Sequence, residues 1–168
     1  MVTLKADRIL ISPLSVADTN FLFKLMNTPK WKKYIGDRNI KNPADAKTYL
    51  KSSILPSYQK YGFGLFGVRL RATDQPMGIC GFLQRDYLPH PDLGFAILPD
   101  FERKGYIHEA ADLLLANKGL FAIDNKVLAI TTPENHASVA LLEKLGFIQK
   151  GNIPTDTKEE VLLLEKEL

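Results

Sequence analysis

The sequence predicts a mixed α/β domain in which an antiparallel sheet carries parallel strands at its centre. Apolar residues alternate after Phe63, and the turn 72–76 joins this run to a second one ending near Arg85, which indicates an antiparallel hairpin. Further on, the apolar runs 93–98 and 127–131 flank a helical stripe, and this order of elements favours a right-handed parallel crossover. The length of 168 residues fits one domain, residues 1–168.

The chain opens with a short strand followed by a helix. Residues 8–14 form an apolar run typical of a strand, and Ser15 with Asp18 makes a capping box that begins an amphipathic helix. Pro29 ends this helix. The stretch 30–38 that follows is aromatic and basic and has no clear period.

A second helix is expected from Pro43 to about Lys60. Asn42 is a favourable N-cap, and Pro43 suits the first helical position because its missing N–H needs no partner there. Pro56 lies inside this helix, so we expect a break or a kink at that point.

The central unit runs through the two apolar strands and the helix between them. Gly94 marks a bulge or a close approach of another backbone. The run 127–131 is apolar on both faces, as a buried parallel strand requires. The helix after Gly105 places one apolar stripe toward the core: Ile107, Ala110, Ala111, Leu114, Leu115 and Phe121.

One more helix and two strands complete the chain. The helix extends from about His136 to Leu145, and Gly146 suits its C′ position. Residues 147–149 and 160–164 follow as strands.

Composition excludes several classes of protein. Apolar residues make up 45% and charged residues 24%, as in ordinary globular proteins, and the net charge of +3 is scattered, which does not favour nucleic acid as a partner. Cys80 is the only cysteine, so no internal disulfide forms and a reducing cytoplasm fits. The three histidines lack metal-ligand spacing, so we expect no metal. No apolar leader or run of about 18 residues is present, so we expect an untargeted cytoplasmic protein without membrane contact.

The segment 99–111 has the layout of an anion site. A strand-like run precedes it and a helix begins inside it, so the amides of the first helical turn have no intrahelical partner and carry the positive end of the helix dipole. Gly105 gives the backbone freedom for a tight turn. A phosphate group is the natural ligand of such a turn.

Two motifs in register resemble those of the GCN5-related N-acetyltransferases. Residues 102–107, Glu-Arg-Lys-Gly-Tyr-Ile, resemble the Gln/Arg-x-x-Gly-x-Gly/Ala pyrophosphate loop of that family, and 135–147 resemble its Asn-x-x-Ser/Ala…Lys-Leu-Gly-Phe ending, about 30 residues later. The run 93–99 is similar to the family's fourth strand. The opening strand, 8–14, resembles that of the branch that includes the ribosomal-protein acetyltransferases RimJ and RimL.

This resemblance implies a fold of about seven strands and four helices, with acetyl-CoA in a V-shaped cleft where the fourth and fifth strands part after a bulge. It also implies the cofactor-binding residues. The main chain of Phe95, Ala96, Ile97 and Leu98 would bind pantetheine, the amides of Arg103, Lys104, Gly105, Tyr106, Ile107 and His108 would hold the pyrophosphate, and the Asn135 carboxamide would reach the pantetheine. Ile107 stands where the family has Gly or Ala.

The same resemblance implies direct acetyl transfer to a primary amine in a ternary complex. Leu142 occupies the position where many relatives carry a tyrosine acid, so Ser138 is the candidate general acid. Asp92 is the candidate general base and Asp86 the alternative, with Glu102 a weaker one. Cys80, in an apolar strand with no neighbouring His, is not expected to act as a nucleophile.

The acceptor is left open by the sequence. Trp31, Tyr34 and the second helix are expected to wall its site, which suits a peptide N-terminus, while a polyamine, an amino sugar or an antibiotic amine stays an alternative. The oligomeric state stays open as well, and a homodimer is only what the family resemblance suggests. A non-catalytic acyl-CoA-binding module is the alternative function, motivated by Leu142 and Ile107, whereas a dinucleotide-binding domain is excluded because Gly-x-Gly-x-x-Gly is missing after the first strand.

Overall fold

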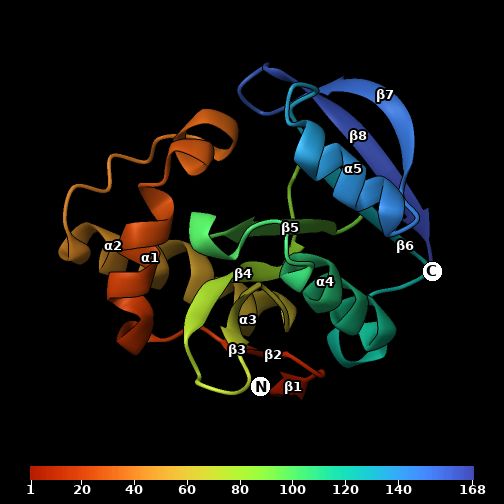
Figure 1. Ribbon diagram of the computed structural model, residues 1–168. Coiled ribbons are helices and arrows are strands. Elements are labelled where there is room, and N and C mark those ends of the chain that lie inside the picture. Colours follow the sequence, from red (N-terminus) through yellow and green to blue (C-terminus); the bar gives the residue numbers. More distant parts are fainter.

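A computed structural model describes residues 1–168 and shows one eight-stranded sheet with the strand order β1-β2-β3-β4-β5-β6-β8-β7 (Figure 1). The strands are β1 (Leu4–Lys5), β2 (Ile9–Pro13), β3 (Leu65–Leu70), β4 (Pro76–Leu83), β5 (Asp92–Ile97), β6 (Lys126–Thr131), β7 (Ile148–Pro154) and β8 (Glu160–Glu167). The helices are α1 (Thr19–Met26), α2 (Pro43–Tyr49), α3 (Leu55–Tyr61), α4 (Tyr106–Ala116) and α5 (His136–Lys144). The predicted mixed, mostly antiparallel fold is confirmed, with one strand more than expected and with the second predicted helix divided into α2 and α3.

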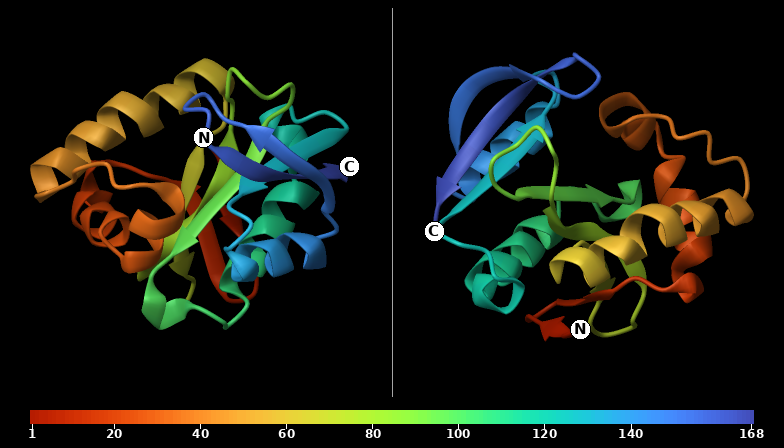
Figure 2. Two further views of the ribbon diagram at one scale, coloured as in Figure 1. Left: turned by 90° about the horizontal axis from the view of Figure 1, so that it is seen from above. Right: turned by 180° about the vertical axis from the view of Figure 1, so that it is seen from behind.

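All neighbouring strands are antiparallel except β5 and β6, which are parallel. These two strands share a single pair, Asp92 with Leu128, whereas β4 and β5 pair continuously from Leu83–Asp92 to Gly78–Ile97. The right-hand view of Figure 2 shows that β5 and β6 diverge beyond their paired ends. The sheet therefore splits between β5 and β6, and the gap widens toward their carboxyl ends.

The split does not come from a bulge in β5, because the β4–β5 register is uninterrupted through Gly94. Of the two alternatives predicted for Gly94, the bulge is therefore wrong, and a Cβ there would meet side chains and not another backbone. A Cβ at this position would lie 2.6 Å from Cδ1 of Leu83 and 3.6 Å from Cδ2 of Leu65. Glycine stands here because two side chains from neighbouring strands cover its face of the sheet.

Helices cover both faces of the sheet and create two cores (Figure 2). The larger core lies between the sheet and α4, with Leu142 of α5 in it. The smaller core joins α1 and α2 to the opposite face through Ile79 and Leu98. A buried ion pair between Asp18, which precedes α1, and Arg69 of β3 fastens the second layer to the sheet.

The second predicted helix is continuous but contains a π-helical turn, Leu50–Ile54, between α2 and α3. Asn42 caps α2 through its side chain, as predicted. Pro56 lacks the N–H for a normal helical bond, and the wider turn just before it accommodates the loss without ending the helix. None of the helices is long and apolar enough to cross a membrane.

Candidate active site

The edge of β5 that faces β6 offers unpaired main-chain groups. Leu98 donates its amide to Met77 of the β4 side, and Pro91 accepts from Leu128 of β6. Because main-chain groups alternate in direction along a strand, Phe95 and Ile97 point into the split while Ala96 and Leu98 point to β4. Of the four residues expected to bind pantetheine, Phe95 and Ile97 therefore have main-chain groups free for a ligand. The main-chain groups of Ala96 face β4, and the Leu98 carbonyl accepts a hydrogen bond from the Phe101 amide.

The loop after β5 presents a row of free amides. None of the amides from Arg103 to His108 donates to a main-chain acceptor. Arg103 and Gly105 have φ angles of 60° and 81°, so left-handed residues alternate with others and curve the row into a concave nest. Ile107 is 7% exposed and its side chain packs into the larger core, while its amide belongs to the first turn of α4 and has no main-chain acceptor.

Arg8 fixes this loop from the first strands of the sheet. Its Nη1 donates to the Lys104 carbonyl at 2.8 Å, its Nε donates to Oε2 of Glu109 at 2.7 Å, and its guanidinium lies 4.6 Å from the centre of the Tyr106 ring. At the other end of the loop, Lys30 pairs with Glu102 at 2.7 Å. Glu102 therefore helps to hold the loop in place. The contacts of Arg8 with the loop were not predicted from the sequence.

The start of α5 brings Asn135 and Ser138 to the carboxyl end of β6. The Asn135 side chain accepts a hydrogen bond from the Ser138 amide at 3.3 Å and so caps the helix. Its carboxamide NH2 keeps both donors available. The Ser138 side chain is half-buried and makes no hydrogen bond within the protein. Leu142, one turn further, is 1% exposed and packs in the core.

Asp92 begins β5 at the apex of the split and is 1% exposed. The Arg85 Nε donates to both of its oxygens, at 3.0 and 3.2 Å. Burial raises the pKa of Asp92 to about 6, and the guanidinium limits the rise. The Tyr87 hydroxyl lies beside the same guanidinium. Asp86, in contrast, is exposed next to Lys60.

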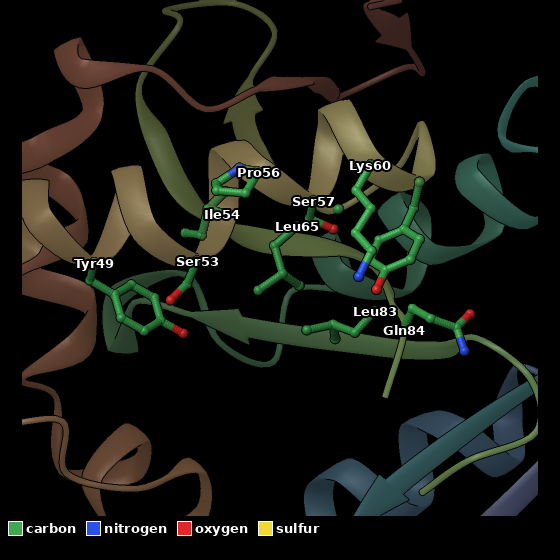
Figure 3. A pocket seen from close by; sticks show the side chains of 11 residues that line it. Tyr49, Ser53, Ile54, Pro56, Ser57, Lys60, Leu65, Leu83 and Gln84 are labelled. Carbon is green, nitrogen blue, oxygen red and sulfur yellow. The ribbon is translucent and has the colours of Figure 1, made fainter. Parts of the chain in front are cut away.

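A pocket of about 240 Å³ lies between the helix 43–61 and the β3–β4 side of the sheet (Figure 3). Its walls include Leu65 and Leu83, the two side chains that cover Gly94. These two side chains therefore lie between the pocket and β5, close to the level where β5 and β6 part. Its polar lining comes mainly from the helix and the end of β4: Tyr49, Ser53, Ser57, Lys60, Tyr61 and Gln84.

Trp31 and Tyr34, which were expected to wall the acceptor side, do not line this pocket. Trp31 is 4% exposed and packs in the smaller core, where its indole N–H has no partner. Tyr34 lies under the Lys33 ammonium, 5.0 Å from its ring centre, and does not line the pocket. The aromatic stretch folds into a π-helical turn, Trp31–Ile35, that buries its first residue, so Trp31 is not available as a wall, whereas the role expected for Tyr34 stays a prediction.

The split between β5 and β6, the free amides before α4 and the capped start of α5 follow one another along the chain in the same order as in a known family. A model of the acetyltransferase (GNAT) domain matches residues 8–148 of the chain. The chain belongs to the GNAT family of acetyltransferases. This GNAT protein is accordingly an acetyl-CoA-dependent enzyme, as the sequence motifs predicted.

Individual relatives agree with the family assignment. The chain is 24% identical to the uncharacterized N-acetyltransferase YoaA of Bacillus subtilis over 151 residues, which are 88% of this chain and 84% of that protein. An acetyltransferase structure from Agrobacterium tumefaciens has a TM-score of 0.81 and 21% identity, covering 100% of this chain and 95% of that one. The ribosomal-protein α-N-acetyltransferase RimL in complex with coenzyme A has a TM-score of 0.84 at 11% identity, covering 99% and 98%. These structures share the fold of this GNAT chain.

Proposed function

We propose that this GNAT enzyme transfers the acetyl group of acetyl-CoA to a primary amine by direct attack in a ternary complex. The observation that carries the proposal is the juxtaposition at β5. Its free edge and the amide nest lie along one route into the split, and the polar pocket under the helix 43–61 lies next to the same strand, with Leu65 and Leu83 between the pocket and Gly94. Two substrates can therefore approach the same strand from two directions.

The cosubstrate would be held mostly by main chain. The nest from Arg103 to His108 suits the pyrophosphate, and the main-chain groups of Phe95 and Ile97 suit the amides of pantetheine as an added strand would. The free carboxamide donors of Asn135 lie on the opposite side of the split. Bound acetyl-CoA supplies an activated thioester carbonyl.

Ser138 is proposed as the general acid. In the transfer, a C–N bond forms, the C–S bond breaks, the amine loses a proton and the departing thiolate gains one. Ser138 lies in the first turn of α5, where the positive end of the helix dipole favours a nearby thiolate. Because no other protein group binds this hydroxyl, it is free to donate.

The amine must reach the thioester in its neutral form. An α-amine has a pKa of about 7.7–8.0, so a large fraction is neutral at pH 7.4, whereas a lysine side chain with a pKa of about 10.4 is neutral only about one part in a thousand. Asp92 is proposed to receive the proton through water, since Arg85 covers its carboxylate and its pKa of about 6 keeps it ionised at neutral pH. Asp86 is the alternative base. The modest demand on this base favours an α-amine acceptor, as the name of RimL also does.

The test is thiol release from acetyl-CoA in the presence of N-terminal peptides, polyamines or aminoglycosides. Release that depends on an acceptor, together with a mass increase of one acetyl group on it, supports the proposal. Tight binding of acetyl-CoA without release across the whole panel would favour the non-catalytic module.

A further inference from the structure

We propose that the pocket beside β5 selects acceptors that carry an anionic group close to the reacting amine. The inference rests on the proposed function, because it assigns the acceptor class to the same site. It excludes polyamines and aminoglycosides as preferred acceptors, since these place further ammonium groups near the reacting one.

The charge of the lining is the first observation. Lys60 is the one charged residue among the side chains that wall the pocket, and no carboxylate lines it. Asp86 neighbours Lys60 but stands outside the lining. The buried Asp92 is already paired with Arg85. A second ammonium group on an acceptor would therefore find no counter-charge inside the pocket, whereas an anion would find Lys60.

The arrangement of the polar groups is the second observation. Tyr49 and Ser53 lie at one end of the pocket, and Lys60 and Gln84 lie at the other (Figure 3). The side chains of Tyr49, Ser53 and Gln84 form no hydrogen bond within the protein, so their donors are available to a ligand. The amide of Gln84 can share an anion with the neighbouring ammonium.

The rim beyond Tyr49 adds more positive charge. The Arg38 guanidinium lies 5.8 Å from the centre of the Tyr49 ring. Arg38 belongs to the stretch 30–41, in which five Lys or Arg residues are opposed by one acidic residue, Asp37. Approaching acceptors with negative charge are therefore attracted at both ends of the pocket.

The experiment compares peptide acceptors that differ only in charge. Tripeptide amides with a free N-terminal serine and glutamate, glutamine or lysine at the second position are assayed at saturating acetyl-CoA, and a fourth peptide with phosphoserine there separates phosphate from carboxylate. We expect kcat/KM to be about tenfold higher for glutamate than for lysine, with glutamine between them. The preference should fall at high salt, because Lys60 is exposed.

Variants assign the preference to the pocket. Lys60→Glu should give the lysine peptide a higher kcat/KM than the glutamate peptide. Lys60→Met should make the two kcat/KM values equal. Lys51→Glu is the matched control, since Lys51 is exposed on the same helical segment but does not line the pocket. Transfer at equal rates to all peptides, or an order unchanged by Lys60→Glu, would overturn the inference. Absence of transfer to every acceptor would overturn the proposed function itself, and the inference with it.

Discussion

The two sides of the split sheet present different kinds of groups to the substrates proposed for them. On the α4 side, the groups that would hold acetyl-CoA belong mostly to the main chain: the nest from Arg103 to His108 and the edge of β5. On the side of the helix 43–61, the pocket presents side chains, among them Tyr49, Ser53 and Lys60. A site made of main chain keeps its function through many substitutions, whereas a site made of side chains changes its specificity with each one.

Ser138 is the main exception to this contrast, because a side chain is proposed to act on the side where main-chain groups would hold acetyl-CoA. Ser138→Ala should lower kcat by about 100-fold, as expected for loss of a general acid, while the Kd of acetyl-CoA changes little. Single-turnover kinetics with an N-terminal peptide and equilibrium binding of acetyl-CoA measure the two effects. Val139→Ala, at the next position of α5, is a control for small packing changes. Equal loss of affinity and rate would make Ser138 a binding residue.

The role of Asp92 shows whether the amine loses its proton at the apex of the split, between the two sides. Its pKa of about 6 is raised, so it is protonated below pH 6 and its base function is lost as the pH falls through that value. For an α-amine acceptor, log kcat/KM should rise with a slope of one between pH 6 and 7.7 and with a slope of two below pH 6.

The variants separate the two candidate bases. Asp92→Asn should keep a slope of one throughout the acidic range, and Asp86→Asn should keep the wild-type profile. The slope does not depend on the amount of folded enzyme, so partial unfolding from the unpaired Arg85 does not obscure it. A wild-type profile in Asp92→Asn, with the second slope lost in Asp86→Asn, would transfer the role to Asp86.

The sequence predicted the main-chain side better than the pocket, for a physical reason. Gly105, Asn135 and the intervening strand and helix are local signals, since a left-handed turn and an N-cap need particular residues at particular positions. The pocket depends on how the helix 43–61 crosses β4, which no local pattern encodes. Trp31 shows the limit: it looks like an aromatic wall in sequence, but tertiary packing buries it. Arg8 was missed because its partners Lys104 and Glu109 lie about 100 residues away.

Arg8 is an intermediate case between the two sides, because its side chain would act by fixing the main chain of the loop that is proposed to bind the pyrophosphate. Arg8→Ala removes the contacts to Lys104, Glu109 and Tyr106, and we expect the Kd of acetyl-CoA to rise about tenfold through a less ordered nest. Arg71→Ala is the matched control, since Arg71 is an exposed arginine that donates to the Ala6 carbonyl away from the loop. Calorimetric titration measures both. If kcat with saturating acetyl-CoA also falls, Arg8 does more than position the loop.

Cys80 should have the smallest effect on catalysis, and it tests the premise of direct transfer that both sides share. Burial raises the pKa of its thiol to about 12, so the thiolate needed for an acetyl-enzyme intermediate is scarce at neutral pH. Cys80→Ala should keep kcat/KM within about twofold while costing about 1 kcal/mol of unfolding free energy for the small cavity. Denaturant unfolding and steady-state kinetics separate these effects. A folded Cys80→Ala enzyme without activity would contradict direct attack, because amine and thioester would then have to react in turn with the enzyme.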